Sequence, residues 1–308
     1  MSTSVDLNLS EAQRIRQIRE DLELARQDGA ITTINEVLFK LGTALLDVEN
    51  VPEALTCFEE GLKNARQNGD QQTEARFQGN RGLALARIGN YQLATKAFRK
   101  SYKLAKKINH TTLMCDALTQ TGILHSRRAE PLQAISKLDQ ALGLAEQIQD
   151  QVRQSHIAEL LGSLFLSVRS TDKAYEYYGK ALNLAQMMGN RQTECAYTIE
   201  LGKIYLLDGI LNLAEQFLKT GLKIARQLKD DRFELEAFSS LVQVTITAGD
   251  LDLATYYSQH AVEIARLIQD QGAEVSQLNT LIDLYLEQDL AHKALPVIEQ
   301  ALSLAVEQ

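Results

Sequence analysis

The 308-residue sequence contains no tryptophan, only three prolines and only three cysteines. Scarce proline, together with abundant Ala, Leu, Gln, Glu, Lys and Arg, predicts an all-α fold. The cysteines are odd in number and lack C-x-x-C spacing, which argues against a disulfide framework and a zinc site. No apolar run approaches the roughly 18 residues of a membrane span, and the N-terminus does not resemble a secretion signal. We therefore expect a cytoplasmic protein without a metal or cofactor.

The net charge of −8 is distributed unevenly along the chain. Residues 71–110 carry nine Lys and Arg against Glu74 alone, whereas residues 231–308 carry three cations against thirteen carboxylates. The cations of residues 96–107 fall on one expected helix with only Tyr102 nearby for base stacking, so a solvated face is favoured over nucleic-acid binding. Contact with the acidic end of a second copy is an alternative.

Alanine recurs every forty residues, at positions 25, 65, 105, 145, 185, 225, 265 and 305. A second series runs from Ala54 to Ala294 at the same interval. A fixed period of a few tens of residues is typical of stacked-repeat proteins, in which each copy buries the apolar face of its neighbour. The period therefore predicts one elongated array without an internal domain boundary.

Each forty-residue unit shows two helical patterns separated by turn signals. In one unit we expect helices from about Gln71 to Ile88 and from about Gln92 to Ile108. Residues 1–30 are interpreted as a tail followed by a lone capping helix that begins with the capping-box sequence at Ser10. Good helix caps are expected at five of the six junction residues Asp70, His110, Asp150, Asn190, Asp230 and Asp270. The predicted repeats are 31–70, 71–110, 111–150, 151–190, 191–230, 231–270 and 271–308.

Small residues predict where the two helices of a unit meet. Glycines such as Gly42 and Gly82 lie midway along the first helix, where glycine costs about 1 kcal/mol against alanine unless a close approach needs it. Alanines of the second helix, such as Ala54 and Ala94, supply a flat face. Bulky residues, including Phe58 and Phe98, fill the space beside it.

The pattern Leu41-Gly42, Ala54, Phe58 and Gly61, repeated from Leu201-Gly202 onward, resembles the tetratricopeptide repeat. A forty-residue period is similar to the subfamily of the Leu-Gly-Asn repeat protein, kinesin light chains and bacterial peptide-sensing regulators. The resemblance covers residues 31–308. It implies a right-handed α-solenoid, or superhelix, of about seven helix-turn-helix repeats with an N-terminal capping helix.

In that family, the stripe formed here by residues 36, 40, 43 and 47 and their copies lines a concave peptide-binding groove. Steps of four, three and four return to one face of a helix, so these residues lie together. The stripe varies between copies while the packing positions stay constant. The groove candidates are Arg76, Asn80, Arg87, Gln120, Arg127, His156, Lys203 and Gln243.

Repeats two and three depart most from the other copies. Arg81, Thr121 and His125 stand where most copies have bulky apolar residues, and with Arg76 and its neighbours we expect them to concentrate hydrogen-bond donors in one region. Arginine forks and amides suit carboxylates, so an acidic peptide or a chain terminus is one hypothesis. For any single residue, snorkelling or pairing with a nearby acid is the favoured alternative.

The last helix, roughly residues 292–306, is apolar around most of its circumference, although terminal repeats normally need a polar outer face. Homo-oligomerisation through this end is therefore an alternative. Its candidate interface residues are Leu295, Ile298, Leu302, Leu304 and Val306.

No catalytic motif is found, and the five histidines lie in separate helices or junctions. Cys115 and His156 could approach one another, but they would form an incomplete metal site and an unoriented dyad. The sequence thus predicts a non-enzymatic scaffold or adaptor that binds a protein or peptide segment. A peptide-sensing regulator and a self-assembling structural protein are the alternatives.

Overall fold

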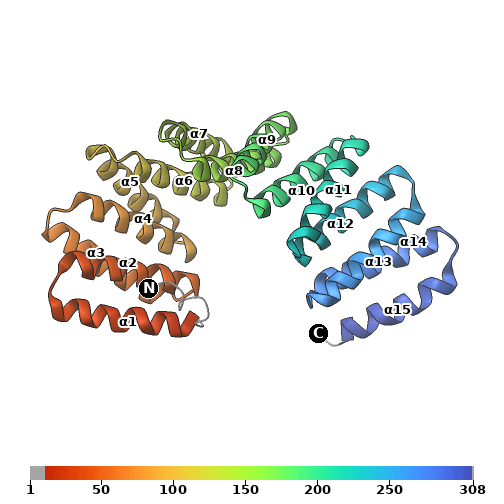
Figure 1. Cartoon of the computed structure of the whole chain (residues 1–308), viewed down its shortest axis with the longest axis horizontal. Helices are drawn as coiled ribbons and strands as arrows, with labels where there is room; N and C mark the ends of the chain where they lie inside the picture. The colour runs from red at the N-terminus through yellow and green to blue at the C-terminus, as the bar shows by residue number, and fades with distance from the viewer. Residues whose placement is uncertain (1–10, 307–308) are drawn as a thin grey trace. The chain divides into compact units, whose positions relative to one another are not determined.

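The computed structural model describes residues 11–306, with side chains through residue 304; Ser10 and the rest of the expected tail lie outside this range. The described residues form helices joined by short turns, which confirms the predicted all-α solenoid class (Figure 1). The helices are α1 (Glu11–Asp28), α2 (Ile31–Asp47), α3 (Val51–Gln67), α4 (Gln71–Arg87), α5 (Tyr91–Lys107), α6 (Thr111–Arg127), α7 (Pro131–Gln147), α8 (Gln151–Ser167), α9 (Thr171–Met187), α10 (Arg191–Leu207), α11 (Leu211–Leu228), α12 (Asp231–Ala248), α13 (Leu251–Leu267), α14 (Gln271–Glu287) and α15 (Ala291–Val306).

The chain divides into two compact units, residues 1–160 and 161–308, and α8 contains the boundary. In the first unit, consecutive helices from α1 to α7 pack against one another, and α2 contacts α4 while α4 contacts α6. We call α2, α4 and α6 the even-helix layer, and α3, α5 and α7 the odd-helix layer. The second unit repeats the arrangement from α9 to α15, with α10 against α12. The seven-repeat division of residues 31–308 stays a prediction.

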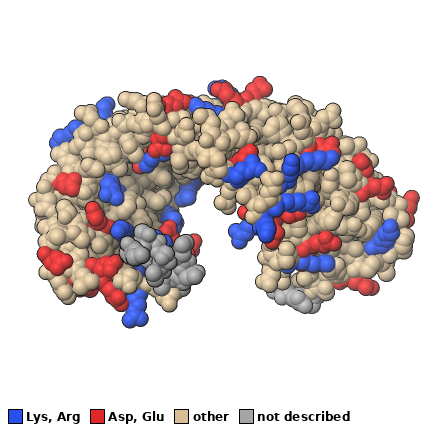
Figure 2. Space-filling model, viewed as in Figure 1, with Lys and Arg blue, Asp and Glu red and all other residues tan. Residues whose placement is uncertain are grey.

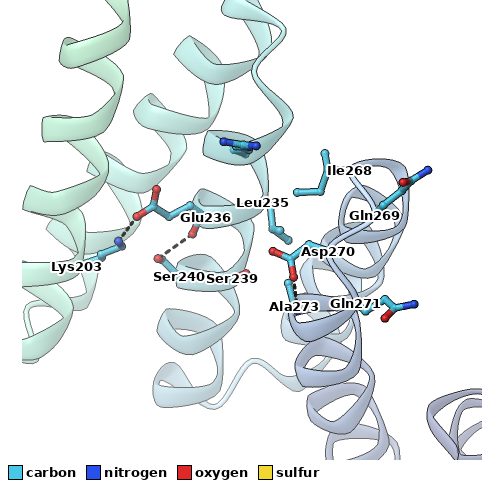
Figure 3. Close-up of a pocket in the computed structure, with 11 residues that line it drawn as sticks. Lys203, Leu235, Glu236, Ser239, Ser240, Ile268, Gln269, Asp270, Gln271 and Ala273 are labelled. Atoms are coloured by element: carbon cyan, nitrogen blue, oxygen red, sulfur yellow. Dashed lines mark hydrogen bonds and ion pairs between the residues drawn. The ribbon is translucent and has the colours of Figure 1, made fainter. Parts of the chain in front are cut away.

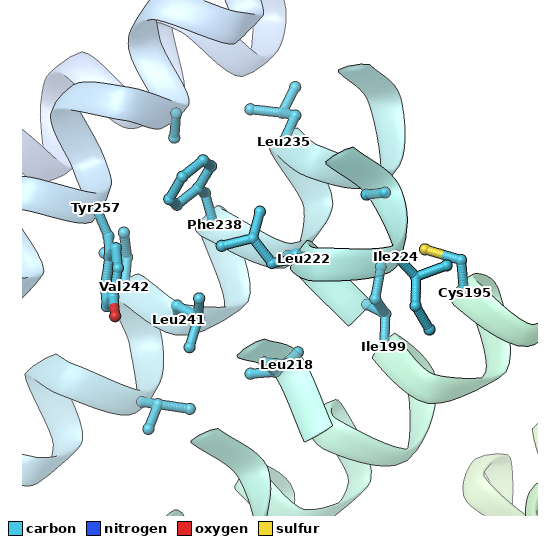
Figure 4. Packing of buried hydrophobic residues seen from close by; sticks show 14 of the residues in the cluster. Cys195, Ile199, Leu218, Leu222, Ile224, Leu235, Phe238, Leu241, Val242 and Tyr257 are labelled. Carbon is cyan, nitrogen blue, oxygen red and sulfur yellow. The ribbon is translucent and has the colours of Figure 1, made fainter. Parts of the chain in front are cut away.

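The regularly spaced alanines are core residues. In the 25-to-265 series every alanine is buried, and the second series, from Ala54 to Ala294, is at most 1% exposed. Larger apolar residues complete the core, as around Leu218, Phe238 and Leu241 in the second unit (Figure 4). Among the described residues, no helix is long and apolar enough to cross a membrane.

Glycine allows the paired helices to approach closely. A Cβ atom on Gly42 would lie 2.3 Å from Phe58 Cε1, and one on Gly82 would lie 2.6 Å from Phe98 Cε1. Both distances are far below the 3.5–4.0 Å of a normal carbon contact. Each ring occupies the space that a side chain would need, so the close approach expected at these two glycines is observed, with the bulky residue itself against the glycine.

Every junction between described helices contains a residue with positive φ, at twenty-residue intervals from Gly29 to Asp289. Six of these residues are glycines and eight, such as Ala129, are not. The reversed turn satisfies carbonyl groups at the helix end: Asn90 N–H donates to Leu85 O at 2.9 Å and Gly89 N–H to Ala86 O at 3.2 Å. This pair of hydrogen bonds is the Schellman arrangement.

The junction residues also cap the following helices. The Asp70 carboxylate accepts from Thr73 N–H at 3.0 Å, and the Asn190 side chain accepts from Thr193 N–H at 3.2 Å. His110 caps α6 as well, because its Nδ1 accepts from Leu113 N–H at 3.3 Å. All six junction residues therefore cap the next helix, one more than the sequence predicts.

Candidate peptide-binding groove

Three hollows follow one another along the even-helix layer of the first unit. A hollow of about 250 Å³ is lined by Phe39, Arg76, Asn80 and Gln120, among others. A second hollow of about 230 Å³ shares Phe39 and Arg76 with the first, and a third, of about 10 Å³, shares Gln120 and adds Arg127. We call these connected hollows the α2–α4–α6 groove. The structure thus brings together four of the predicted groove residues.

Arg76 is held at the junction of two hollows by an aromatic ring. Its guanidinium carbon lies 4.3 Å from the centroid of the Phe39 ring. This cation–π contact restrains the side chain without using its N–H hydrogen-bond donors. Among the described residues, no carboxylate forms an ion pair with Arg76. The groove therefore contains an oriented cation that is not in an ion pair, although Asp70 and Glu36 line the second hollow and the Arg76 charge helps to lower the pKa of Asp70.

Amide groups lie beside this cation. Asn80 donates through Nδ2 to Arg76 O at 3.0 Å, which leaves its side-chain oxygen available. Gln120 makes no side-chain hydrogen bond within the described part of the chain. A primary amide can both donate and accept, as a peptide backbone requires.

The one acid that shares the first hollow is neutralised. Asp116 Oδ1 lies 2.8 Å from Arg153 Nε, and Asp116 Oδ2 lies 3.2 Å from Arg153 Nη2. Arg153 also donates to Asp150 Oδ2 at 2.5 Å. Hydrogen bonding to Asp116 is the main cause that raises the pKa of Arg153. An anion entering the groove would therefore meet little repulsion from Asp116.

Other predicted donors are used elsewhere. Arg87 donates through Nη1 to Leu46 O, and Arg81 Nε lies 3.4 Å from Glu59 Oε1. Thr121 and His125 line a different cavity, between α5 and α7. Thr121 and His125 therefore do not form one region with Arg76. Adjacent positions on α6 differ by about 100° around the helix axis, so Thr121 lies on a different face from Gln120, which lines the hollow that contains Arg76.

A larger hollow, of about 880 Å³, lies in the second unit over α12 and the start of α14 (Figure 3). Lys203 reaches it from α10 and is held by Glu200, at 2.9 Å, and by Glu236. Burial alone would lower the pKa of Lys203, but these two carboxylates outweigh it and raise the pKa. The Lys203 charge is already compensated, so it is a poorer anion ligand than Arg76. Gln243 is exposed and does not line this hollow.

The remaining candidates lie apart from the groove. His156 is exposed, with Nδ1 3.5 Å from Glu159 Oε2. On α15, Leu295 and Leu302 are 61% and 60% exposed, whereas Ile298 and Leu304 pack against buried clusters. The side chain of Val306 lies outside the described residues.

The cysteines lie in the core. Cys115 Sγ donates to Ala141 O and Cys195 Sγ to Gly221 O, each at 3.3 Å. Burial is the main cause that raises the pKa of Cys57, Cys115 and Cys195 to about 11. Cys115 is buried and His156 exposed, so they do not form a catalytic pair. Within residues 11–306, no three His, Cys, Asp or Glu side chains are placed to hold a metal ion.

Charged side chains of both signs are interspersed on the face shown in Figure 2. In the first unit, cations of α1 pair with acids of α3: Arg19 with Glu53 at 2.6 Å and Arg26 with Glu60 at 2.8 Å. On α5, Lys100 pairs with Glu74 at 2.8 Å. These charges are therefore compensated locally.

These features define a helical-repeat protein with a groove along one layer of helices. Residues 33–107 match the sequence model of the tetratricopeptide repeat, which confirms the resemblance seen in the sequence. No curated protein matches the chain.

Solved structures share the fold across most of the chain. The apo form of RapI has a TM-score of 0.74 at 13% identity, covering 96% of this chain and 86% of RapI. A signal-transduction ATPase with a tetratricopeptide repeat sensor from Pyrococcus horikoshii has a TM-score of 0.71 at 16% identity; 95% of this chain spans 47% of that protein, about half its length. The apo quorum sensor NprR from B. thuringiensis has a TM-score of 0.63 at 12% identity, covering 96% of this chain and 83% of NprR.

Proposed function

We propose that the chain is a non-enzymatic interaction protein that binds an extended peptide in the α2–α4–α6 groove, with a peptide carboxylate at Arg76. The observation that carries this proposal is the Arg76 guanidinium, 4.3 Å from the Phe39 ring and in no ion pair among the described residues. An arginine fork can bind a carboxylate through two parallel hydrogen bonds. Because Phe39 already restrains Arg76, less side-chain entropy is lost on binding.

An extended peptide suits the shape and chemistry of the groove. Its three hollows run across successive helices of one layer, as binding surfaces of stacked-repeat proteins do. A peptide backbone presents N–H and C=O groups that must keep hydrogen-bond partners when water is removed. The amides of Asn80 and Gln120 supply such partners beyond Arg76.

The proposal can be tested with a library of random heptapeptides that have free C-termini. Peptides selected on the purified chain are synthesised, and their affinities are measured by fluorescence polarisation. We expect enrichment of Asp and Glu, or dependence on the terminal carboxylate. Arg76→Glu should weaken binding at least about tenfold, equivalent to about 1.4 kcal/mol. Joint replacement of Asn80 and Gln120 by alanine should weaken it further.

Lys63→Glu is the matched control, because Lys63 is an exposed cation on α3 outside the groove. It applies the same change of charge and should leave affinity within about twofold. Selected peptides that bind the wild type and Arg76→Glu equally well would refute the groove as the binding site.

A second candidate, a regulator that senses a peptide, is supported by the shared fold with a quorum sensor and with the repeat sensor of a signalling ATPase. Sensing requires that the ligand favour one conformation over another. Hydrogen exchange with and without a selected peptide tests this. Protection confined to the groove supports a scaffold, whereas protection that extends into residues 161–308 supports a sensor.

A third candidate, self-assembly, is supported by the exposure of Leu295 and Leu302 on α15. Light scattering at several concentrations tests it. Leu302→Glu is the informative variant, since Leu304 packs against the core and its replacement would also destabilise the helix. A concentration-dependent oligomer that Leu302→Glu dissociates supports assembly; a monomer at every concentration removes it.

A further inference from the structure

A cavity of about 500 Å³ lies between α5 and α7 of the odd-helix layer, with α6 as its floor. Arg99 and Tyr102 line it from α5, Lys137 from α7, and Thr121 and His125 from α6. The lining of this cavity shares no residue with the α2–α4–α6 groove. Gln120 and Thr121 are neighbours in the sequence, yet Gln120 lines the groove and Thr121 lines the cavity.

The cavity arises where this repeat departs from its copies. Eighty residues before Thr121 and His125, Leu41 and Leu45 occupy the equivalent positions and are 3% and 1% exposed. Forty residues later, Leu161 and Phe165 are 0% and 6% exposed. In these copies the two positions are filled by apolar side chains that pack in the core. Threonine is smaller than leucine and both replacements are polar, so space and hydrogen-bonding groups replace a packed apolar contact.

Polar contacts hold the floor of the cavity in place. Thr121 Oγ1 donates to Ala117 O at 2.7 Å, and His125 Nδ1 lies 2.6 Å from Glu130 Oε2. Arg128 Nη2 lies 2.9 Å from Glu130 Oε1. Glu130 is therefore shared between a cation and an imidazole, and the acid that lines the cavity is already occupied.

The walls provide cations that are not compensated. Neither Arg99 nor Lys137 forms an ion pair or a side-chain hydrogen bond with the described residues. They come from the two helices that flank the cavity, so a bound anion can contact both. Tyr102 and Leu118 add apolar surface to the lining. Hydrogen bonds between such cations and an anion are stronger than neutral ones.

From these contacts we infer that the cavity between α5 and α7 binds a small organic anion, whose phosphate or carboxylate groups contact Arg99 and Lys137. The volume of about 500 Å³ lies within the roughly 300–1,000 Å³ typical of small-molecule sites. This site is distinct from the proposed peptide groove, because the two linings share no residue and come from different faces of α6.

The inference can be tested by isothermal titration calorimetry on the full chain with AMP, pyrophosphate and citrate as separate probes. At least one probe should bind with a stoichiometry of one. The three arms distinguish the anion: AMP and pyrophosphate carry phosphate groups, whereas citrate carries carboxylates. Replacing Arg99 and Lys137 together by glutamine should weaken the bound probe at least about tenfold. Absence of binding by all three probes would overturn the inference.

A second variant tests the cavity itself. Thr121→Leu with His125→Leu restores the apolar character that most copies have at these positions, so it should fill the cavity and abolish probe binding. Circular dichroism should show unchanged helix content in this variant. Retained affinity would overturn the inference. The glutamine variant keeps the test decisive if the leucine variant does not fold, because Arg99 and Lys137 form no ion pair or side-chain hydrogen bond with the described residues.

Two controls distinguish binding in this cavity from binding elsewhere on the protein. Lys96→Gln removes an exposed cation of α5 that does not line the cavity, and it should leave probe affinity unchanged. Equal weakening by Lys96→Gln would show attraction to the basic helix as a whole and overturn the inference. Arg76→Glu should also leave affinity unchanged. Loss of probe binding on Arg76→Glu would place the anion in the groove instead.

Discussion

Gly82 lies in the middle of α4, with the ring of Phe98 from α5 directly against its backbone. A methyl group added by Gly82→Ala would lie 2.6 Å from Phe98 Cε1 and 2.7 Å from Phe98 Cδ1. A normal carbon contact needs 3.5–4.0 Å, so the ring would have to move by about 1 Å. Phe98 is almost completely buried and has little room to do so. Overpacking of this kind costs about 1–3 kcal/mol, whereas alanine gains about 1 kcal/mol over glycine in a helix. The expected net loss is about 0–2 kcal/mol.

Gly143 provides the matched control in the same unit. It is an exposed helical residue of α7, and a Cβ atom there would meet no other atom within 4 Å. Gly143→Ala should therefore stabilise the protein by about 1 kcal/mol through helix propensity alone. The difference between the two variants, about 1–3 kcal/mol, measures the overpacking at Phe98.

Urea titration followed by circular dichroism at the helix band measures both changes. In a Phe98→Ala background the ring is gone, so Gly82→Ala should become stabilising, as at Gly143. Such coupling is expected only for residues in contact. If Gly82→Ala and Gly143→Ala stabilise the wild type equally, the interpretation of Gly82 as a packing requirement is wrong.

Three further predictions concern junctions, acid stability and thiols. Ala129 has φ +55°, which costs an L-residue about 1–2 kcal/mol, so Ala129→Gly should raise the urea midpoint while Gly89→Ala, at φ +76°, should lower it. The Arg153 backbone N–H, followed by its side chain, lowers the pKa of Asp150. The contribution of this cap to stability is therefore present above the unfolded carboxyl pKa of about 3.9 and is lost as pH falls through the lower folded value. Asp150→Asn should make the urea midpoint depend less on pH below about 4; an unchanged acid dependence would contradict this. The three cysteines, buried with pKa values of about 11, should react with a disulfide reagent at pH 7.5 only after unfolding. Rapid reaction of the native protein would refute their burial.

Local sequence features predicted the helices well. The expected helix from Gln71 to Ile88 is observed as α4, Gln71–Arg87. Its ends could be predicted because helix caps and turns depend on residues that are neighbours in the sequence. His110 was not expected to cap, since histidine is a less common cap than Asp or Asn. Its Nδ1 nevertheless accepts the Leu113 N–H as a carboxylate oxygen would.

The groove was only partly predictable. Helical periodicity placed Arg76, Asn80 and Gln120 on one stripe, and the structure brings them together. Phe39 was missed because it lies outside that stripe and reaches Arg76 from the neighbouring helix. Arg153 was missed for the same reason, since its contact with Asp116 crosses 37 positions of sequence. Such contacts depend on how helices pack, which one stretch of sequence does not specify.

The cavity between α5 and α7 shows the converse. Thr121 and His125 stand out in the sequence as departures from their copies, but the sequence-based prediction put them on the face of Arg76. Counting 100° for each residue around α6 separates Thr121 from Gln120. The sequence therefore already indicated that Thr121 and Gln120 lie on different faces of α6, through the angular position of each residue around the helix.

The twenty-residue interval of positive φ residues, from Gly29 to Asp289, has a consequence for growth of the chain by gene duplication. A duplicated block of forty residues would leave each helix with the same neighbours and each turn in the same register. A single inserted residue would instead rotate the following part of a helix by about 100° and move its alanines out of the core. Chains that differ in length by whole forty-residue blocks can thus keep the same core contacts. Each added block extends the binding surface without changing how the helices pack.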